Sequence, residues 1–177
     1  MSLSHGALLR RCRARLAALD LPDRISIVGL CQLVEHQRGR PLTLLPLASS
    51  TGPFGVLVSS TRADYVFFAQ NTTPVHQRHI AVHELCHLLC GHQSPVLADS
   101  DLLKLLVPDV DPKLIETLLG RSAYTVEEEW EAEVLASLLL EGVSSWTPAG
   151  ELPSDADASA LLARLRDTLQ GSVGLID

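Results

Sequence analysis

The chain has 177 residues, of which 46% are apolar, and carries a formal net charge of −7 at pH 7. This length and apolar content suffice for one globular domain with a buried core. The negative charge argues against broad binding to nucleic acids or anionic membranes. No apolar run reaches the roughly 18 residues that a bilayer-spanning helix needs.

The N-terminal residues and the cysteines indicate the compartment. Among residues 1–20, four arginines interrupt the apolar positions, which is not the pattern of a secretion signal. The four cysteines form no C-x-x-C pair, so a disulfide framework is not expected. These cysteines are Cys12, Cys31, Cys86 and Cys90. We therefore expect a cytoplasmic protein without a membrane segment.

Two amphipathic helices are predicted at the start of the chain. The first covers residues 5–19 and ends before Pro22, because proline disfavours helical conformation in the preceding residue. The second covers residues 24–37, with Asp23 as its N-cap. The apolar side of this second helix consists of Ile27, Leu30, Cys31 and Val34.

Three short and mostly apolar segments follow, at residues 42–48, 54–60 and 64–70. The last two contain valine and aromatic residues, which favour β-strands, and turn-forming sequences separate all three. We expect a three-stranded antiparallel meander, in which each strand pairs with the next one along the chain.

A helix is predicted directly after the sheet. Thr73 is its expected N-cap, and Pro74 occupies its first position, where the missing N–H of proline leaves no hydrogen bond unmade. Beyond this helix, two shorter helical pieces are expected at residues 95–106 and 111–120. They form an apolar helical insert over residues 93–123, before the next long helix.

Two more helices complete the predicted order of elements. The helix over residues 125–141 begins with a capping box, in which Thr125 is the N-cap and Glu128 follows three residues later. The last helix covers roughly residues 155–170. Strands and helices in separate blocks indicate an α+β fold. Without repeats or linkers, we expect one domain over residues 1–177.

The helix after the sheet contains an H-E-x-x-H run formed by His83, Glu84 and His87. Histidines four residues apart point to the same side of a helix, so both imidazoles can bind one metal ion. Glu84 lies about 100° further around the helix, where it can act as a general base on a water molecule. This run is typical of a zinc hydrolase.

A catalytic zinc ion usually has three protein ligands, so a third must lie elsewhere in the chain. One known arrangement places a third histidine six residues after the second. His92 follows His87 by only five residues. We therefore expect His92 at the end of the helix rather than at the metal.

The glutamate-rich helix offers better candidates for the third ligand. On a helical wheel, Glu127 and Glu131 fall within an apolar stripe, whereas Glu129 and Glu133 point away from it. A carboxylate on an apolar face needs a cation or a hydrogen-bond partner. We expect Glu131 to be the ligand, because it lies deeper in the helix. Glu127 and Glu128 are alternatives, and a salt bridge to Arg78 or Arg121 is the other role for Glu131.

Two stretches of the sequence resemble the ImmA/IrrE family of metallopeptidases. They are residues 77–89 (QRHIAVHELCHLL) and 129–136 (EWEAEVLA), and the resemblance covers roughly residues 42–141. In that family a small sheet precedes the H-E-x-x-H helix, and a later helix contains an E-x-E-A-type motif. The sequence departs from the family pattern at Val82, Cys86, Glu133 and Gly142.

The resemblance implies a minimal zincin-like α+β domain that binds Zn2+ and cleaves proteins. The implied zinc ligands are His83, His87 and Glu131, with Glu84 as the general base. Members of the family act on helix-turn-helix repressors, so the implied partner is a protein, not a nucleic acid or a membrane. The alternative is a non-catalytic, metal-stabilised binding module or a toxin–antitoxin-type partner of a transcriptional regulator.

Several other side chains near the predicted site are of interest. Candidates for a donor that stabilises the transition state are Tyr124, His79 and His76. Tyr124 precedes Glu131 by about two helical turns, although a packing role at the helix start is the alternative. Cys90 falls on the metal-facing side, either as a redox-sensitive thiol or as a small buried residue, and Cys86 is expected in the core.

Overall fold

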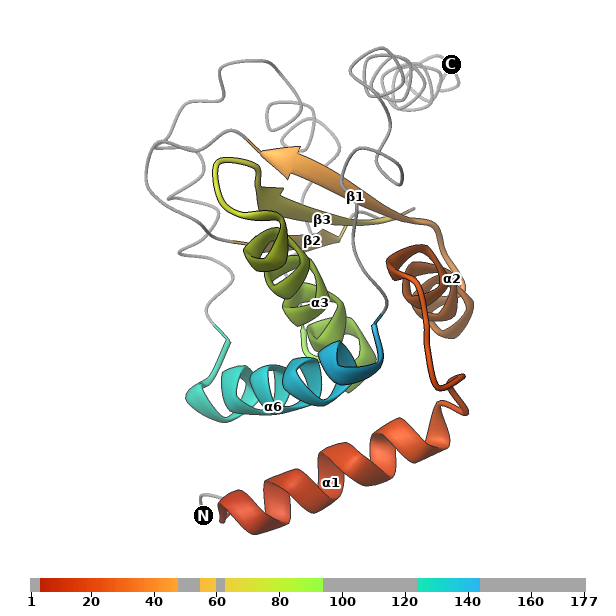
Figure 1. The fold of residues 1–177 in the computed structure, drawn as a ribbon, viewed down its shortest axis with the longest axis vertical. Coiled ribbons are helices and arrows are strands. Elements are labelled where there is room, and N and C mark those ends of the chain that lie inside the picture. Colours follow the sequence, from red (N-terminus) through yellow and green to blue (C-terminus); the bar gives the residue numbers. More distant parts are fainter. Residues whose placement is uncertain (1–3, 48–54, 60–62, 94–123, 144–177) are drawn as a thin grey trace, which may run out of the picture.

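The computed structural model describes residues 4–47, 55–59, 63–93 and 124–143 (Figure 1). The expected helical pieces at 95–106 and 111–120 and the expected helix at 155–170 lie outside these residues. The elements are α1 (His5–Ala18), α2 (Ile27–Arg38), β1 (Leu42–Leu47), β2 (Gly55–Ser59), β3 (Asp64–Ala69), α3 (Pro74–Cys90) and α6 (Val126–Gly142). The predicted α+β class is confirmed.

The starts of α3 and α6 agree with their predicted caps. The Thr73 side chain accepts a hydrogen bond from the backbone N–H of His76, and Pro74 is the first helical residue. At the start of α6, Thr125 and Glu128 form the predicted capping box, with N···O distances of 2.8 and 3.2 Å. Short-range polar contacts therefore define where both helices begin.

Helix α2 begins later than the sequence pattern predicts. Its N-cap is Ser26, whose hydroxyl accepts a hydrogen bond of 3.0 Å from Gly29 N–H, and the prediction of Asp23 was wrong. The reason is a tertiary contact. The backbone N–H of Ile25 donates to the carbonyl of Gly142 at the end of α6, so Ile25 is held in an extended pairing instead of a helix.

The sheet has the strand order β1-β3-β2. β1 is parallel to β3, and β2 is antiparallel to it, so the expected antiparallel meander was wrong. All six residues of β3 are buried, which fits its central place in the sheet. The apolar pattern predicted the strands but not their order, because a central strand and an edge strand can carry similar apolar residues. β2 lies at one edge of the sheet.

The helices pack on one another beside the sheet (Figure 1). α3 contacts β3 and β2, α6 contacts α3, and α1 contacts α6 on the side away from the sheet. The largest buried apolar side chains include Leu30, Leu57, Val66, Phe68, Leu85 and Leu135. Among the described helices, none is long and apolar enough to span a membrane.

A buried carboxylate joins α2 to the sheet. Asp64, at the start of β3, is fully buried and accepts hydrogen bonds from Arg38 Nε at 2.9 Å and from Ser59 Oγ at 2.6 Å. Arg40 Nη2 forms an ion pair with Asp64 Oδ1 at 2.9 Å. A buried carboxylate is costly without polar partners. These contacts therefore help to determine how α2, β2 and β3 meet.

Candidate metal site

α3 and α6 bring two imidazoles and one carboxylate together. The Nε2 atoms of His83 and His87 are 3.1 Å apart, and Glu129 Oε2 lies 3.2 Å from the first and 3.7 Å from the second. Ligands arranged tetrahedrally around zinc at about 2.0–2.1 Å lie roughly 3.3 Å from one another. These three side chains could therefore hold one metal ion, as the grouping of their ligand atoms indicates.

The carboxylate beside the histidines is Glu129, not the expected Glu131. Glu131 is buried on the other flank of α6, where its Oε2 accepts a hydrogen bond of 2.6 Å from Arg11. Its Oε1 lies 3.5 Å from Arg15 Nη2, and its Oε2 lies 3.4 Å from His92 Nε2. The alternative prediction for Glu131 was a salt bridge to Arg78 or Arg121. Glu131 does form salt bridges, but with Arg11 and Arg15 of α1.

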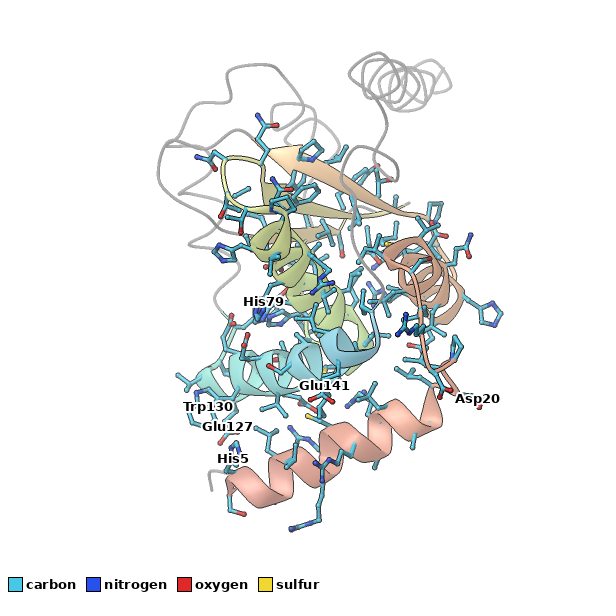
Figure 2. The ribbon with its side chains drawn as sticks, in the orientation of Figure 1. His5, Asp20, His79, Glu127, Trp130 and Glu141 are labelled. Carbon is cyan, nitrogen blue, oxygen red and sulfur yellow. The ribbon has the colours of Figure 1, made fainter. Side chains whose placement is uncertain are left out.

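The helical wheel correctly predicted that Glu131 is buried and has a polar partner. Its apolar stripe of Trp130, Val134, Leu135 and Leu138 was nevertheless centred too far toward Trp130. Trp130 is 56% exposed, whereas the buried side of α6 consists of Ala132, Leu135, Ala136 and Leu139. Figure 2 shows Trp130 and Glu127 at the end of α6 that lies near the start of α1. Residues two apart on a helix differ by about 200°. Glu129 and Glu131 therefore flank the buried side on opposite edges, one toward α3 and the other toward α1.

Glu84 lies in a tight space between α3 and the edge strand. Its side chain is buried, and Gly55 of β2 is so close that an added Cβ would overlap the carboxylate. Burial, and secondly the charge of Glu129, raise the pKa of Glu84 to about 8. A cation held by the neighbouring ligands would lower this pKa again, because it favours the charged carboxylate.

The second histidine of the run is suited to bind a metal as a neutral base. His87 is fully buried, and burial, followed by the charges of His83 and His92, lowers its pKa to about 3. Metal binding requires a deprotonated imidazole nitrogen. The surroundings of His87 therefore keep it in the form that a metal needs.

The outward Nδ1 atoms of the two histidines also have partners. His83 Nδ1 lies 3.3 Å from Glu133 Oε2, which is also 3.2 Å from His79 Nε2. His87 Nδ1 lies 3.0 Å from Nδ1 of His92. Partners of this kind orient metal-binding histidines and select their tautomers. Glu133 is half exposed, but it contacts the site instead of being a purely solvated charge.

Tyr124 stacks directly on the buried histidine. Its ring lies 3.7 Å from that of His87, centroid to centroid, at an interplanar angle of 20°. Its hydroxyl is buried and has no hydrogen-bond partner among the described residues. Burial, followed by the charges of Glu84 and Glu129, raises its pKa. The hydroxyl therefore stays protonated and is available as a donor beside the site.

The remaining candidates lie at different distances from this centre. His76 is exposed in the first turn of α3, where its Nδ1 lies 3.0 Å from Thr72 Oγ1. Cys86 is fully buried in the core, as expected. Cys90 is partly buried and groups with His92 and Glu131, not with the ligand set of His83. Its pKa is raised to about 12, chiefly by burial and then by Glu131.

Sequence reasoning missed Glu129 as the nearest carboxylate and Gly55 as the neighbour of Glu84. A signal for the carboxylates was present in the spacing. Glu129 and Glu133 are four residues apart, like His83 and His87, so each pair shows one side of its helix. In the structure these two sides face each other. No comparable signal identified Gly55, because its contact depends on the strand order.

Comparison with known proteins does not assign the chain to a family. No model of a known protein family matches it, and no curated protein matches it either. The resemblance to the ImmA/IrrE family therefore stays a prediction from two motifs. The arrangement of His83, His87 and Glu129 is the main support for a functional conclusion.

Proposed function

We propose that this protein is a zinc-dependent endopeptidase that cleaves a regulatory protein. The observation that supports this most directly is the convergence of His83 Nε2, His87 Nε2 and Glu129 Oε2 beside the buried carboxyl group of Glu84. Two imidazoles and a carboxylate favour Zn2+ over the harder cations, which prefer oxygen ligands. Bound there, zinc would lower the pKa of a water molecule toward neutrality and polarise a peptide carbonyl.

Glu84 is the proposed general base. Its carboxylate takes a proton from the attacking water and later gives it to the leaving amine. Burial against Gly55 limits the positions that this side chain can adopt. A pKa raised by burial and lowered by a nearby cation suits a group that must both accept and release a proton near neutral pH.

Tyr124 is the proposed donor to the oxyanion. Its protonated hydroxyl is buried without a partner among the described residues, and its ring is held against His87. A donor that is already oriented before the reaction costs no reorganisation when the negative charge develops.

The edge strand β2 is the proposed place for the substrate backbone. β2 pairs with β3 along one side and with no other described strand. An extended peptide can add to such an edge through backbone hydrogen bonds. Because β2 begins at Gly55, beside Glu84, a peptide added there would pass close to the general base.

The substrate class follows from the motif resemblance. A helix-turn-helix repressor is the proposed partner, and cleavage would remove it from its operator. The four thiols are free, which supports a cytoplasmic location, where thiols stay reduced.

The substitution Glu84→Gln tests this function. It keeps the size of the side chain but removes the base, so cleavage of a candidate helix-turn-helix repressor should fall by about 10²–10⁴-fold while zinc stays bound. Glu127→Gln, an exposed change on α6, is the matched control and should leave both unchanged.

The rival is a binding module that holds a metal but does not cleave. The binding module would be supported if wild type and Glu84→Gln both bind the repressor tightly and neither cleaves it. An insert that covers the site would also prevent cleavage, so a variant with the predicted insert shortened within residues 95–120 is the control. If the shortened protein cleaves the repressor, and this cleavage depends on Glu84, the peptidase hypothesis is supported.

A further inference from the structure

The two ring nitrogens of His87 face different surroundings. Nε2 points to the ligand group, 3.1 Å from His83 Nε2, whereas Nδ1 points to Nδ1 of His92 at 3.0 Å. A histidine binds a metal through one nitrogen only if its proton is on the other. The partner of Nδ1 therefore decides whether Nε2 offers a lone pair to a metal.

The end of α3 brings His92 back onto His87. Gly91 ends the helix in the left-handed conformation, with φ of 74°, and the backbone N–H of His92 donates to the carbonyl of His87. The chain therefore turns sharply after Cys90. The two imidazole rings meet edge to face, with centroids 5.1 Å apart.

A buried carboxylate lies on the far side of His92. Glu131 Oε2 is 3.4 Å from His92 Nε2 and 2.6 Å from Arg11 Nη2. Arg15 lies 3.5 Å from the other carboxylate oxygen and also donates to the carbonyl of Leu89 at 2.8 Å. The Glu131 carboxyl group thus accepts hydrogen bonds from two guanidinium groups of α1.

We propose that His92 and Glu131, anchored by Arg11 and Arg15 of α1, are positioning residues that hold His87 in its metal-binding tautomer. The proposal rests on the metal site of the proposed function. It gives the buried glutamate of α6 a role one step away from the metal instead of on it.

Among the arrangements in which His87 and His92 are both neutral imidazoles, only one places a donor opposite an acceptor at both the His87–His92 and the His92–Glu131 contact. Both oxygens of Glu131 accept from arginine side chains. As an acceptor toward His92 as well, Glu131 requires the His92 proton on Nε2. His92 Nδ1 then has a lone pair and accepts from Nδ1–H of His87. His87 Nε2 is left with the lone pair that faces His83 and Glu129. The reverse assignment would set two acceptors against each other at His92 and Glu131.

Cys90, His92 and Glu131 also place one ligand atom each within 4.8 Å of one another. Two features argue against a second metal at this cluster. A dication there would have to compete with Arg11 and Arg15 for the same carboxylate. The Cys90 thiol, in addition, lies in surroundings that favour its neutral form, whereas a metal needs the thiolate.

The test measures zinc affinity of the full-length protein by competition with a chromophoric chelator, together with the ligand-field spectrum of the Co2+ form. His92→Phe keeps a ring in place but removes both nitrogens, and should weaken zinc binding about 10–100-fold and alter the Co2+ spectrum. His92→Asn keeps an acceptor near Nδ1 and should recover most of the loss. The controls are Glu127→Gln on α6 and Arg13→Gln on α1, both at exposed positions. They should change neither the zinc affinity nor the Co2+ spectrum.

Glu131→Gln is the second variant, for use if His92→Phe does not fold. It removes the charge that orients His92 and should also lower zinc affinity, with folding checked by urea unfolding. If folded variants of His92 and Glu131 keep the wild-type zinc affinity and Co2+ spectrum, the proposed positioning of His87 is wrong, while the metal site itself stands. A second Co2+ equivalent that depends on Cys90 would overturn the positioning role as well. If the wild-type protein binds no zinc, both the positioning role of His92 and Glu131 and the proposed peptidase function are wrong.

Discussion

Gly55 of β2 and Glu84 of α3 lie in contact across the boundary between the sheet and the candidate metal site. A Cβ atom on Gly55 would overlap the Glu84 carboxylate and approach Ile80 Cγ2 to 2.7 Å. No side chain larger than hydrogen fits there unless α3 or Glu84 moves. The edge strand and the proposed general base are thus positioned by the same contact.

The first prediction follows from that contact. Gly55→Ala should lower the rate of cleavage about 100-fold, the cost expected when a reacting group is displaced by about 1 Å. Zinc affinity should change little, because the atoms nearest to an added Cβ belong to Glu84 and Ile80 and not to the three ligands. Gly6→Ala is the control, since a Cβ there meets only the end of Arg10 at 3.6 Å. Equal activity of Gly55→Ala and wild type would show that the contact with Gly55 does not position Glu84 for catalysis.

The second prediction ranks the carboxylates of α6 by zinc retention after dialysis. Glu129→Ala should lose most of the bound zinc, because only two nitrogen ligands remain. Glu131→Ala should lose less, since Glu131 acts through His92, and Glu127→Ala should lose none. The sequence pattern predicts the opposite order for the first two. Metal analysis of the three purified variants decides between them.

The third prediction concerns the start of α2. Ser26→Ala should lower the free energy of unfolding by about 1 kcal/mol, because the hydroxyl caps Gly29 N–H. Asp23→Ala should be nearly neutral, since Asp23 is exposed and is not the N-cap. Urea unfolding measures both. A larger loss for Asp23→Ala would mean that the helix begins where the sequence pattern places it.

The fourth prediction concerns the buried aspartate of β3. Asp64→Ala should cost about 3 kcal/mol, at the lower end of the range for breaking a buried ion pair. The lower end applies because Arg38 and Arg40 keep 28% and 26% of their side chains exposed to water. Zinc affinity of the folded fraction should stay unchanged, because none of the metal-site contacts involves Asp64. Urea unfolding followed by chelator competition measures both quantities.

The parts of the fold that depend on neighbouring residues could be predicted from the sequence. Thr73, Pro74 and the Thr125–Glu128 capping box satisfy backbone groups within their own turn, so their signals are local. The pairing of His83 with His87 is local for the same reason. These features need no knowledge of what packs against the helix.

The features that could not be predicted depend on which surface each helix buries. Trp130 is large and apolar but exposed, so an apolar stripe that includes it points in the wrong direction. The strand order was missed because β1 and β3 pair in parallel, with β2 lying between them in the sequence but not in the sheet. Glu131 was understood only in part, since its arginines lie about 120 residues earlier, on α1.

The last prediction separates the two roles of Tyr124. Tyr124→Phe keeps the ring that stacks on His87 but removes the hydroxyl that has no partner among the described residues. If that hydroxyl donates to the oxyanion, the rate constant of the chemical step should fall about 10²–10³-fold, with zinc affinity and Michaelis constant nearly unchanged. Tyr124→Leu also removes the stacking, so it should lower zinc affinity as well. A Phe variant that cleaves at the wild-type rate would leave Tyr124 as a packing residue that supports His87, and single-turnover kinetics distinguishes the two outcomes directly.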